Sequence, residues 1–277
     1  MIRDSFGRID YDETGTGPTV VLVPGSCSTG AAWRPIMAHW ENRFRCVTTS
    51  LSGYGGTAER RTALDSSIAH EADIIEAVIR HTGTPVHLVG HSFGGLAALA
   101  VAQRRRVSLR SLTIIEAPAP ELLRMMFEQE DYFAFRTMTD EYLAAYKAGD
   151  TCAISQMIDF YGGEGTFAGW PQRVRDYAIE TTPVNLLDWK SVYGFTLTPA
   201  FLASVRLPTL VLMGARSHPA VKRANRLLGQ CIPNAAVTRV ADAAHFMIST
   251  HAKEVAHVIA QHLAGVQREY AAITAAN

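Results

Sequence analysis

Hydrophobic residues form two kinds of stretch along this chain: short uninterrupted runs, and longer stretches with an apolar residue at every third or fourth position. The short runs predict strands buried on both faces of a sheet, and the periodic stretches predict helices. The predicted strands are Thr19–Val23, Arg45–Thr49, Pro85–Val89, Ser111–Ile115, Leu207–Gly214 and Ala236–Val240. The predicted helices are Ala32–Glu41, Ser66–His81, Phe93–Arg104, Ala220–Leu228 and Ala252–Tyr270. Because the two types alternate, we expect a parallel sheet with helices on both faces.

Two regions depart from this alternation. Near the N-terminus, alternating segments at Ile2–Phe6 and Ile9–Glu13 precede a Gly-Thr-Gly-Pro turn and predict an antiparallel hairpin. Residues 118–206 contain no buried strand but many aromatic residues, and predict a helical insertion. We therefore expect one core domain made of residues 1–117 and 207–277, with residues 118–206 as a helical cap.

Composition narrows the classes of partner. Among 277 residues, 26 Lys and Arg balance 26 Asp and Glu, so no overall charge favours nucleic acid or an anionic membrane. A small neutral molecule is the expected partner, and the basic runs Arg60–Arg61 and Arg104–Arg106 are expected on the solvated surface. No stretch reaches the ~18 apolar residues of a membrane span, and the N-terminus has no apolar signal segment.

The four cysteines are widely spaced and form no C-x-x-C pair, which predicts free thiols and a cytoplasmic location. No G-K-[ST], H-E-x-x-H or Cys/His cluster is present, so we expect neither a metal nor a cofactor. The pattern carries no signal for a particular oligomeric state.

The pentapeptide Gly-His-Ser-Phe-Gly at positions 90–94 lies between a predicted buried strand and a predicted helix. A serine at such a sharp turn is crowded by the residues two positions away on either side, and Gly90 and Gly94 relieve this crowding. The turn lifts the hydroxyl of Ser92 above the sheet, beside the N-H groups of a helix N-terminus. Ser92 is therefore the predicted nucleophile; the competing interpretation is a strand-turn-helix packed by small residues.

Four segments, in this order and spacing, resemble the α/β-hydrolase superfamily over nearly the full chain. They are Val23–Ser26, Gly90–Gly95, Leu207–Gly214 and Ala244–Phe246. The resemblance implies an α/β fold of the α/β-hydrolase type: a mostly parallel, eight-stranded sheet flanked by helices. It also implies that a helical cap is inserted after the sixth strand, where the aromatic-rich segment lies.

A serine nucleophile needs a base, and the resemblance implies His245, in the loop after the last strand. The family usually has an aspartate shortly after the strand ending at Gly214, but this chain has no carboxylate there. Some members place the acid after the sixth strand, where this chain has Glu116. A carboxylate among Ile, Ala and Pro needs a partner, and His245 fits that need. Asp242 and a bare Ser-His dyad remain alternatives.

The resemblance also implies two backbone donors for an oxyanion. One is the N-H of Phe93, directly after the nucleophile. The other is the N-H of Ser26 in the loop after Val23, with Cys27 as a possible substitute.

These residues predict a serine hydrolase that cleaves carboxylic esters of apolar or aromatic small molecules through an acyl-enzyme. The aromatic cap favours a hydrophobic pocket, although we expect most of its aromatic residues to form the cap's own core. Carbon-carbon bond hydrolysis, lactone hydrolysis and thioester hydrolysis use the same catalytic residues and remain alternatives. Carbon-carbon bond hydrolases of this family typically keep an aspartate after the strand ending at Gly214, so Ser217 argues against that activity. A catalytically silent ligand-binding protein is the alternative of another class. Dehalogenases and epoxide hydrolases use a carboxylate nucleophile, which Ser92 does not supply.

Overall fold

The main sheet has seven strands in the order β3-β5-β4-β6-β7-β8-β9. The computed structural model describes residues 1–83 and 85–275. The strands are β3 (Asp12–Thr14), β4 (Thr19–Val23), β5 (Arg45–Thr48), β6 (Val86–His91), β7 (Leu109–Ile115), β8 (Thr209–Gly214) and β9 (Ala235–Val240). Only β3 runs antiparallel to its neighbour, so the predicted, mostly parallel sheet is confirmed.

The predicted count of eight strands is wrong for the main sheet of the described residues. The N-terminal hairpin forms, but β1 (Ile2–Asp4) pairs only with β2 (Gly7–Ile9), in a separate two-stranded sheet. The predicted second arm, Ile9–Glu13, is thus divided between two sheets. Ile9 is the last residue of β2 in the hairpin, whereas Asp12–Thr14 forms the edge strand of the main sheet beside β5. Strands of three residues satisfy few backbone groups, so local turns decide their pairing. The cap segment consequently follows the fifth strand of the main sheet, β7.

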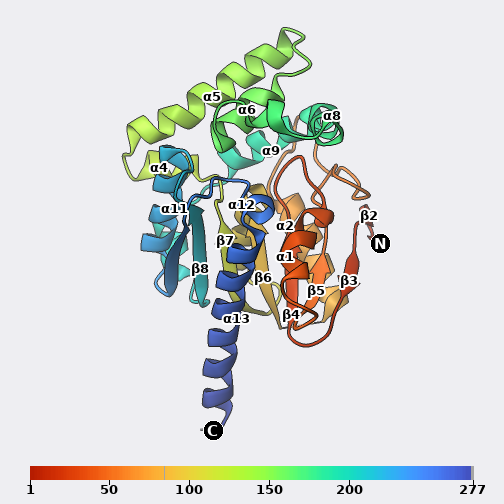
Figure 1. Cartoon of the computed structure of the whole chain (residues 1–277), viewed down its shortest axis with the longest axis vertical. Coiled ribbons are helices and arrows are strands. Elements are labelled where there is room, and N and C mark those ends of the chain that lie inside the picture. The colour runs from red at the N-terminus through yellow and green to blue at the C-terminus, as the bar shows by residue number, and fades with distance from the viewer. Residues whose placement is uncertain (84, 276–277) are drawn as a thin grey trace.

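Side chains of alternate residues in the central strands enter two separate cores. Val21 and Val23 of β4 pack in the core that contains α2 (Ala69–Thr82), α3 (Phe93–Arg104) and α11 (Pro219–Cys231). Val20 and Leu22 pack on the other side with α1 (Arg34–Ala38), α12 (Met247–Thr250) and α13 (Ala252–Ala275). Helices therefore cover both faces, as the apolar runs predict, and α13 extends beyond the sheet at its C-terminal end (Figure 1). The predicted helix Ala32–Glu41 is shorter: a 3-10 turn, η1 (Gly30–Trp33), leads into α1.

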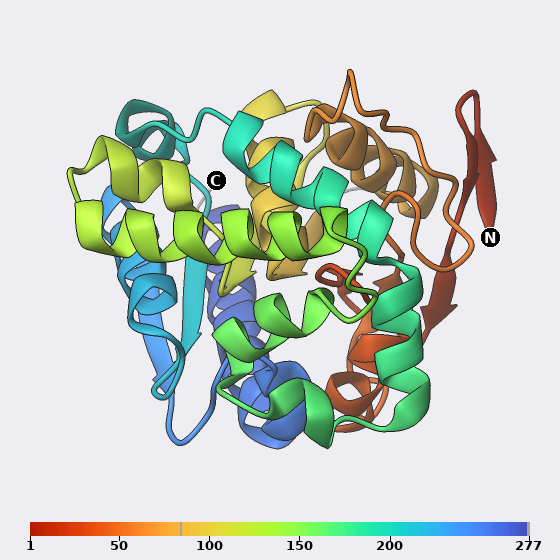
Figure 2. The same ribbon diagram turned by 90° about the horizontal axis from the view of Figure 1, so that it is seen from above.

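The segment between β7 and β8 is helical, as predicted. Its helices are α4 (Pro120–Met125), α5 (Gln129–Lys147), α6 (Ile154–Gly162), α7 (Thr166–Gly169), α8 (Gln172–Glu180), α9 (Thr182–Gly194) and α10 (Pro199–Ser204). Helices α4 to α9 lie over the end of the sheet at which the parallel strands terminate (Figures 1 and 2). The short helix α10 lies farther from that end, where the carbonyl oxygen of Ser204 accepts a hydrogen bond from Arg105 at the C-terminal end of α3. The division into core and cap domains stays a prediction, and residues 276–277 of the predicted core segment lie outside the described residues.

Aromatic side chains pack together inside the helical segment. The ring of Phe135 is fully buried, 5.4 Å from the ring of Phe160 and 6.3 Å from that of Trp189. Tyr142 is also fully buried. These rings supply the segment's own hydrophobic interior, as expected from its composition.

A buried ion cluster joins α9 to the rest of the molecule. The guanidinium of Arg61 lies 2.5 Å from Asp188 of α9, 3.2 Å from Glu71 of α2 and 2.9 Å from Glu59. The expectation that Arg60–Arg61 lies on the solvated surface is wrong, because both side chains are almost fully buried. A charge withdrawn from water needs counter-charges, and only the folded chain brings Glu71 and Asp188 to Arg61.

All four cysteines are unpaired, as predicted. Among the residues that the structure describes, no helix combines the length and apolar character required to cross a bilayer.

Candidate active site

Ser92 lies at the turn between β6 and α3, with φ 53° and ψ −126°. A Cβ atom on Gly90 would lie 2.3 Å from the carbonyl oxygen of Gly94, and one on Gly94 would lie 2.3 Å from that of Pro24. Neither position therefore accepts a larger residue without a backbone shift. The predicted crowding at positions 90 and 94 is confirmed, and the strained serine sits where the strand order reverses between β4 and β6.

Glu116 and His245 come together from opposite parts of the sequence. Glu116 directly follows β7 and has a φ of 49°; His245 follows β9. Nδ1 of His245 lies 2.9 Å from Oε2 of Glu116, and both side chains are buried. The other carboxylate oxygen accepts the N-H of Gly214 at 2.6 Å and the hydroxyl of Ser217. Three donors thus bind the carboxylate, as a buried charge requires hydrogen-bond partners.

The alternative acid faces away from this pair. Asp242 forms a 2.7 Å ion pair with Arg216, and about 70% of each side chain is exposed to solvent. An exposed ion pair of this kind contributes little energy and holds no buried histidine. In this structure the carboxylate partner of His245 is Glu116.

Two aromatic rings pack close to the ring of His245. The Tyr161 ring of α6 lies 4.1 Å from it, and the His91 ring lies 4.8 Å from it, measured between centroids. The Nε2–H of His91 donates to the carbonyl oxygen of His245 at 2.9 Å, across 154 positions of sequence. Burial, and secondarily the neighbouring His245, lower the pKa of His91 to about 3. His91 is therefore neutral at neutral pH and adds no positive charge beside His245.

The low pKa of His91 predicts a loss of stability in acid. The pKa falls from an ordinary 6.5 to about 3 on folding, so the unfolded chain binds this proton first. The contribution of neutral His91 to the free energy of unfolding is fully present above pH 6.5 and is lost as the pH falls toward 3. Between pH 6.5 and 5, we expect the wild-type free energy of unfolding to fall by roughly 2 kcal/mol more than that of His91→Gln. Urea titrations of both proteins across this range measure the difference.

Parallel pH profiles for the two proteins would contradict this assignment. The buried His87, whose pKa burial also lowers, is present in both proteins and cancels from the comparison.

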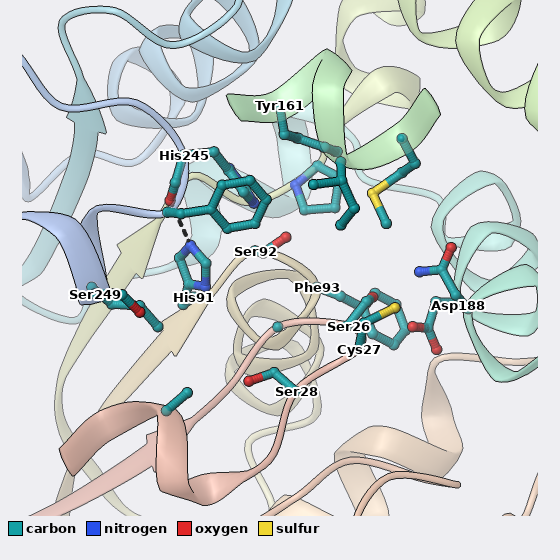
Figure 3. A pocket seen from close by; sticks show the side chains of 18 of the residues that line it. Ser26, Cys27, Ser28, His91, Ser92, Phe93, Tyr161, Asp188, His245 and Ser249 are labelled. Atoms are coloured by element: carbon teal, nitrogen blue, oxygen red, sulfur yellow. Dashed lines mark hydrogen bonds between the residues drawn. The ribbon is translucent and has the colours of Figure 1, made fainter. Parts of the chain in front are cut away.

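A cavity of about 350 Å³ lies between the sheet and the helical segment. The predicted residues Ser26, Ser92, Phe93 and His245 all line it, together with Cys27 (Figure 3). Glu116 lies behind His245 and does not line the cavity. Seven further apolar lining residues come from helices α6, α8 and α9 and from the loop before α8: Met157, Ile158, Tyr161, Trp170, Val174, Trp189 and Val192.

The sequence interpretation missed several residues of this region. The hydroxyl of Ser217, a residue shortly after β8, donates a hydrogen bond to Glu116. Asn185 and Asp188 bring polar groups into an otherwise apolar cavity. Their only sequence signal is a spacing of three on a helix, which does not separate a site from an ordinary solvated face. In the described part of the chain, no group of three or more His, Cys, Asp or Glu side chains lies close enough to hold a metal ion.

Comparison with known proteins identifies the family. The profile described as "alpha/beta hydrolase fold" matches residues 18–252. Haloalkane dehalogenase 2 of Mycobacterium tuberculosis is 32% identical over 111 residues, which are 40% of this chain and 38% of the dehalogenase. The chain thus matches well under half the length of that relative.

Two solved structures share the whole architecture. A thermophilic esterase from Thermogutta terrifontis has a TM-score of 0.73 at 22% identity, covering 93% of both chains. The enol-lactonase from Burkholderia xenovorans has a TM-score of 0.72 at 17% identity, covering 92% of this chain and 96% of the lactonase. At such identities the likeness concerns the fold. The strand order, the strained serine turn and the matched profile together show that this chain belongs to the α/β-hydrolase family.

Proposed function

We propose that the protein is a serine hydrolase that cleaves carboxylic esters of apolar or aromatic small molecules. The observation that carries the proposal is the 2.9 Å hydrogen bond between Glu116 and His245, because His245 and Ser92 line the same cavity. This bond occupies Nδ1 of His245 and leaves Nε2 as the ring nitrogen that can take a proton.

In the proposed reaction, the Ser92 hydroxyl attacks the ester carbonyl while His245 Nε2 accepts the serine proton. Glu116 holds the Nδ1–H and stabilises the imidazolium. The tetrahedral intermediate collapses, and the alcohol leaves with the proton from His245. Water then attacks the acyl-enzyme with His245 again as base, which releases the acid and restores Ser92.

The N-H groups of Ser26 and Phe93 are the proposed oxyanion donors. Phe93 is the first residue of α3, so no earlier turn of the helix accepts its N-H. The loop after β4 approaches Ser92 closely: a Cβ atom on Gly25 would lie 2.8 Å from Cβ of Ser92. Only glycine at position 25 lets the following Ser26 come this near to the nucleophile.

Likeness to a haloalkane dehalogenase does not carry that activity to this chain. Displacement of a halide from an alkyl carbon requires a carboxylate nucleophile that forms an alkyl ester, whereas the residue at the strained turn here is Ser92. We also propose that residues 118–206 act as a cap whose helices α6 and α9 close the apolar cavity over the substrate. The apolar lining favours an apolar or aromatic substrate group.

A fluorophosphonate probe tests the proposal. We expect stoichiometric labelling of the wild-type protein, with the modified peptide containing Ser92. A panel of esters with graded acyl chains, extended to lactones and thioesters, then ranks the carbonyl classes by kcat/KM. Protein that resists the probe and turns over no member of the panel would overturn the hydrolase assignment and leave a ligand-binding role.

A further inference from the structure

One end of the cavity carries two polar side chains that ester hydrolysis does not require. Asn185 and Asp188 lie three positions apart on α9, each about 1% exposed, and both line the cavity. Asp188 lies on the side of Ser26 and Cys27, whereas Ser249 lies on the opposite side of Ser92 (Figure 3). The two residues therefore mark one end of an apolar space.

The side-chain amide of Asn185 has one partner within the part of the chain that the structure describes. Its oxygen accepts the hydroxyl of Tyr142 at 3.0 Å, and this bond orients the amide. Its Nδ2 donates to no described residue. Because Asn185 lines the cavity, a molecule bound there can supply the acceptor that this Nδ2 donor lacks.

The carboxylate of Asp188 is held but not saturated. It accepts from Nη1 of Arg61 at 2.5 Å and from the Tyr54 hydroxyl at 2.6 Å. Burial raises the pKa of Asp188, and the charge of Arg61 is the largest effect opposing this rise. The Ser26 side chain also hydrogen-bonds this carboxylate. Two carboxylate oxygens offer about four acceptor positions, so one position remains beyond these three bonds.

We propose that Asn185 and Asp188 form a subsite for a hydroxyl group on the substrate, separated from the ester carbonyl by an apolar linker. This inference rests on the proposed function. The hydroxyl accepts from Nδ2 of Asn185 and donates to Asp188, so one atom satisfies both. The linker lies along the apolar lining of α6 and α9, including Met157 and Trp189.

Other polar groups fit this pair less well. An ammonium group carries donors only, so it leaves the Nδ2 donor of Asn185 without an acceptor. A carboxylate carries acceptors only and meets the charge of Asp188 at short range. A methyl group forms no hydrogen bond with either polar side chain, so a ligand ending in a methyl group is expected to bind more weakly than one ending in a hydroxyl.

Binding to the Ser92→Ala protein tests the subsite without catalysis. Calorimetry compares methyl ω-hydroxyalkanoates with methyl alkanoates in which a methyl group replaces the hydroxyl, over graded chain lengths. We expect one chain length at which the hydroxyl ligand binds at least about fivefold tighter, the value of one or two net hydrogen bonds. Ligands ending in an ammonium or a carboxylate are the comparison arms, and we expect both to bind more weakly.

The test of the two side chains uses a pair replacement that preserves the protein interior. Asn185→Leu combined with Tyr142→Phe removes both partners of one hydrogen bond. Thr182, which also hydrogen-bonds Tyr142, keeps its bond to the carbonyl oxygen of Ala178. We expect this protein to lose the hydroxyl preference while its thermal midpoint stays close to wild type. Ser249→Ala, on the opposite side of Ser92, is the matched control and keeps the preference. In the catalytic protein, the same substitutions shift the kcat/KM ratio of hydroxyl to methyl esters in the same direction.

Equal binding of the hydroxyl and methyl ligands at every chain length would overturn the subsite, as would a preference that survives the pair replacement. Tighter binding of the ammonium ligand would overturn it too. These results are separable from the hydrolase assignment. If the protein prefers the hydroxyl ligand but does not react with fluorophosphonate, the subsite is supported and the hydrolase function is excluded. If the protein hydrolyses esters but shows no hydroxyl preference, the hydrolase function is supported and the subsite is excluded.

Discussion

Replacing Ser92 with alanine is expected to lower kcat for the best ester by about a millionfold. Without the nucleophile, the base and the acid have no proton to transfer, so the loss is about as large as that of removing all three residues. The substitution removes one oxygen at a position where α3 begins, and it leaves the bond between Glu116 and His245 in place. Stopped-flow and long-time assays of the purified variant measure the remaining rate. The same variant is expected to take up no fluorophosphonate.

The control for this variant is Ser249→Ala, which removes a hydroxyl from the same cavity wall but not from the strained turn. It is expected to react with the probe at nearly the wild-type rate. If Ser92→Ala retained labelling, the nucleophile would be another residue, and the assignment of Ser92 would fail.

Replacing Glu116 with glutamine is expected to lower kcat by about three to four orders of magnitude, with KM much less affected. An amide keeps the shape of the side chain, but it cannot stabilise the imidazolium that forms when His245 takes the serine proton. The amide group of glutamine can also donate to Nδ1 of His245, which favours the tautomer with the proton on Nε2, where a base cannot accept the serine proton. Steady-state kinetics with circular dichroism and thermal unfolding separate this effect from a loss of fold.

Asp242→Asn is the matched control, because Asp242 is the other carboxylate near His245 in sequence but pairs with Arg216 at the surface. We expect it to keep kcat within about twofold, as surface substitutions commonly do.

A second substitution is expected to restore part of the activity that Glu116→Gln loses. Ser217 touches Glu116 directly, so Ser217→Asp in the Glu116→Gln protein returns a carboxylate near His245. We expect this double variant to regain at least about tenfold in kcat; wild-type rates in Glu116→Gln itself would exclude Glu116 as the acid.

Local patterns predicted the main elements well where an element is long and its burial is uniform. Strand β4 (Thr19–Val23) and helix α3 (Phe93–Arg104) have the predicted bounds. Each is apolar over most of its length, and the lengths of five and 12 residues distinguish a buried strand from a buried helix without reference to the rest of the chain. The short N-terminal strands were harder, since three residues do not specify a partner and β3 pairs with β5 more than 30 positions away.

The sequence was sufficient for the sharp turn around Ser92, because the two glycines and their flanking strand and helix are contiguous. It also pointed to Glu116, since a carboxylate after a buried strand needs a partner. It could not predict that Ser217 donates to that carboxylate, because the two residues are 101 positions apart and a serine carries no signal of its partner.

Folding therefore decided the chemistry that depends on long-range contact. His91 looks like a local residue of the turn, yet its ring reaches the backbone of His245. Arg61 looks like a surface cation, yet it lies buried among carboxylates of three separate segments. Asn185 and Asp188 meet the cavity only because α9 packs across the end of the sheet. Periodicity and turn chemistry are local and can be deduced from neighbouring residues, whereas the burial, charge and hydrogen-bond partners of a side chain depend on which distant segments fold against it.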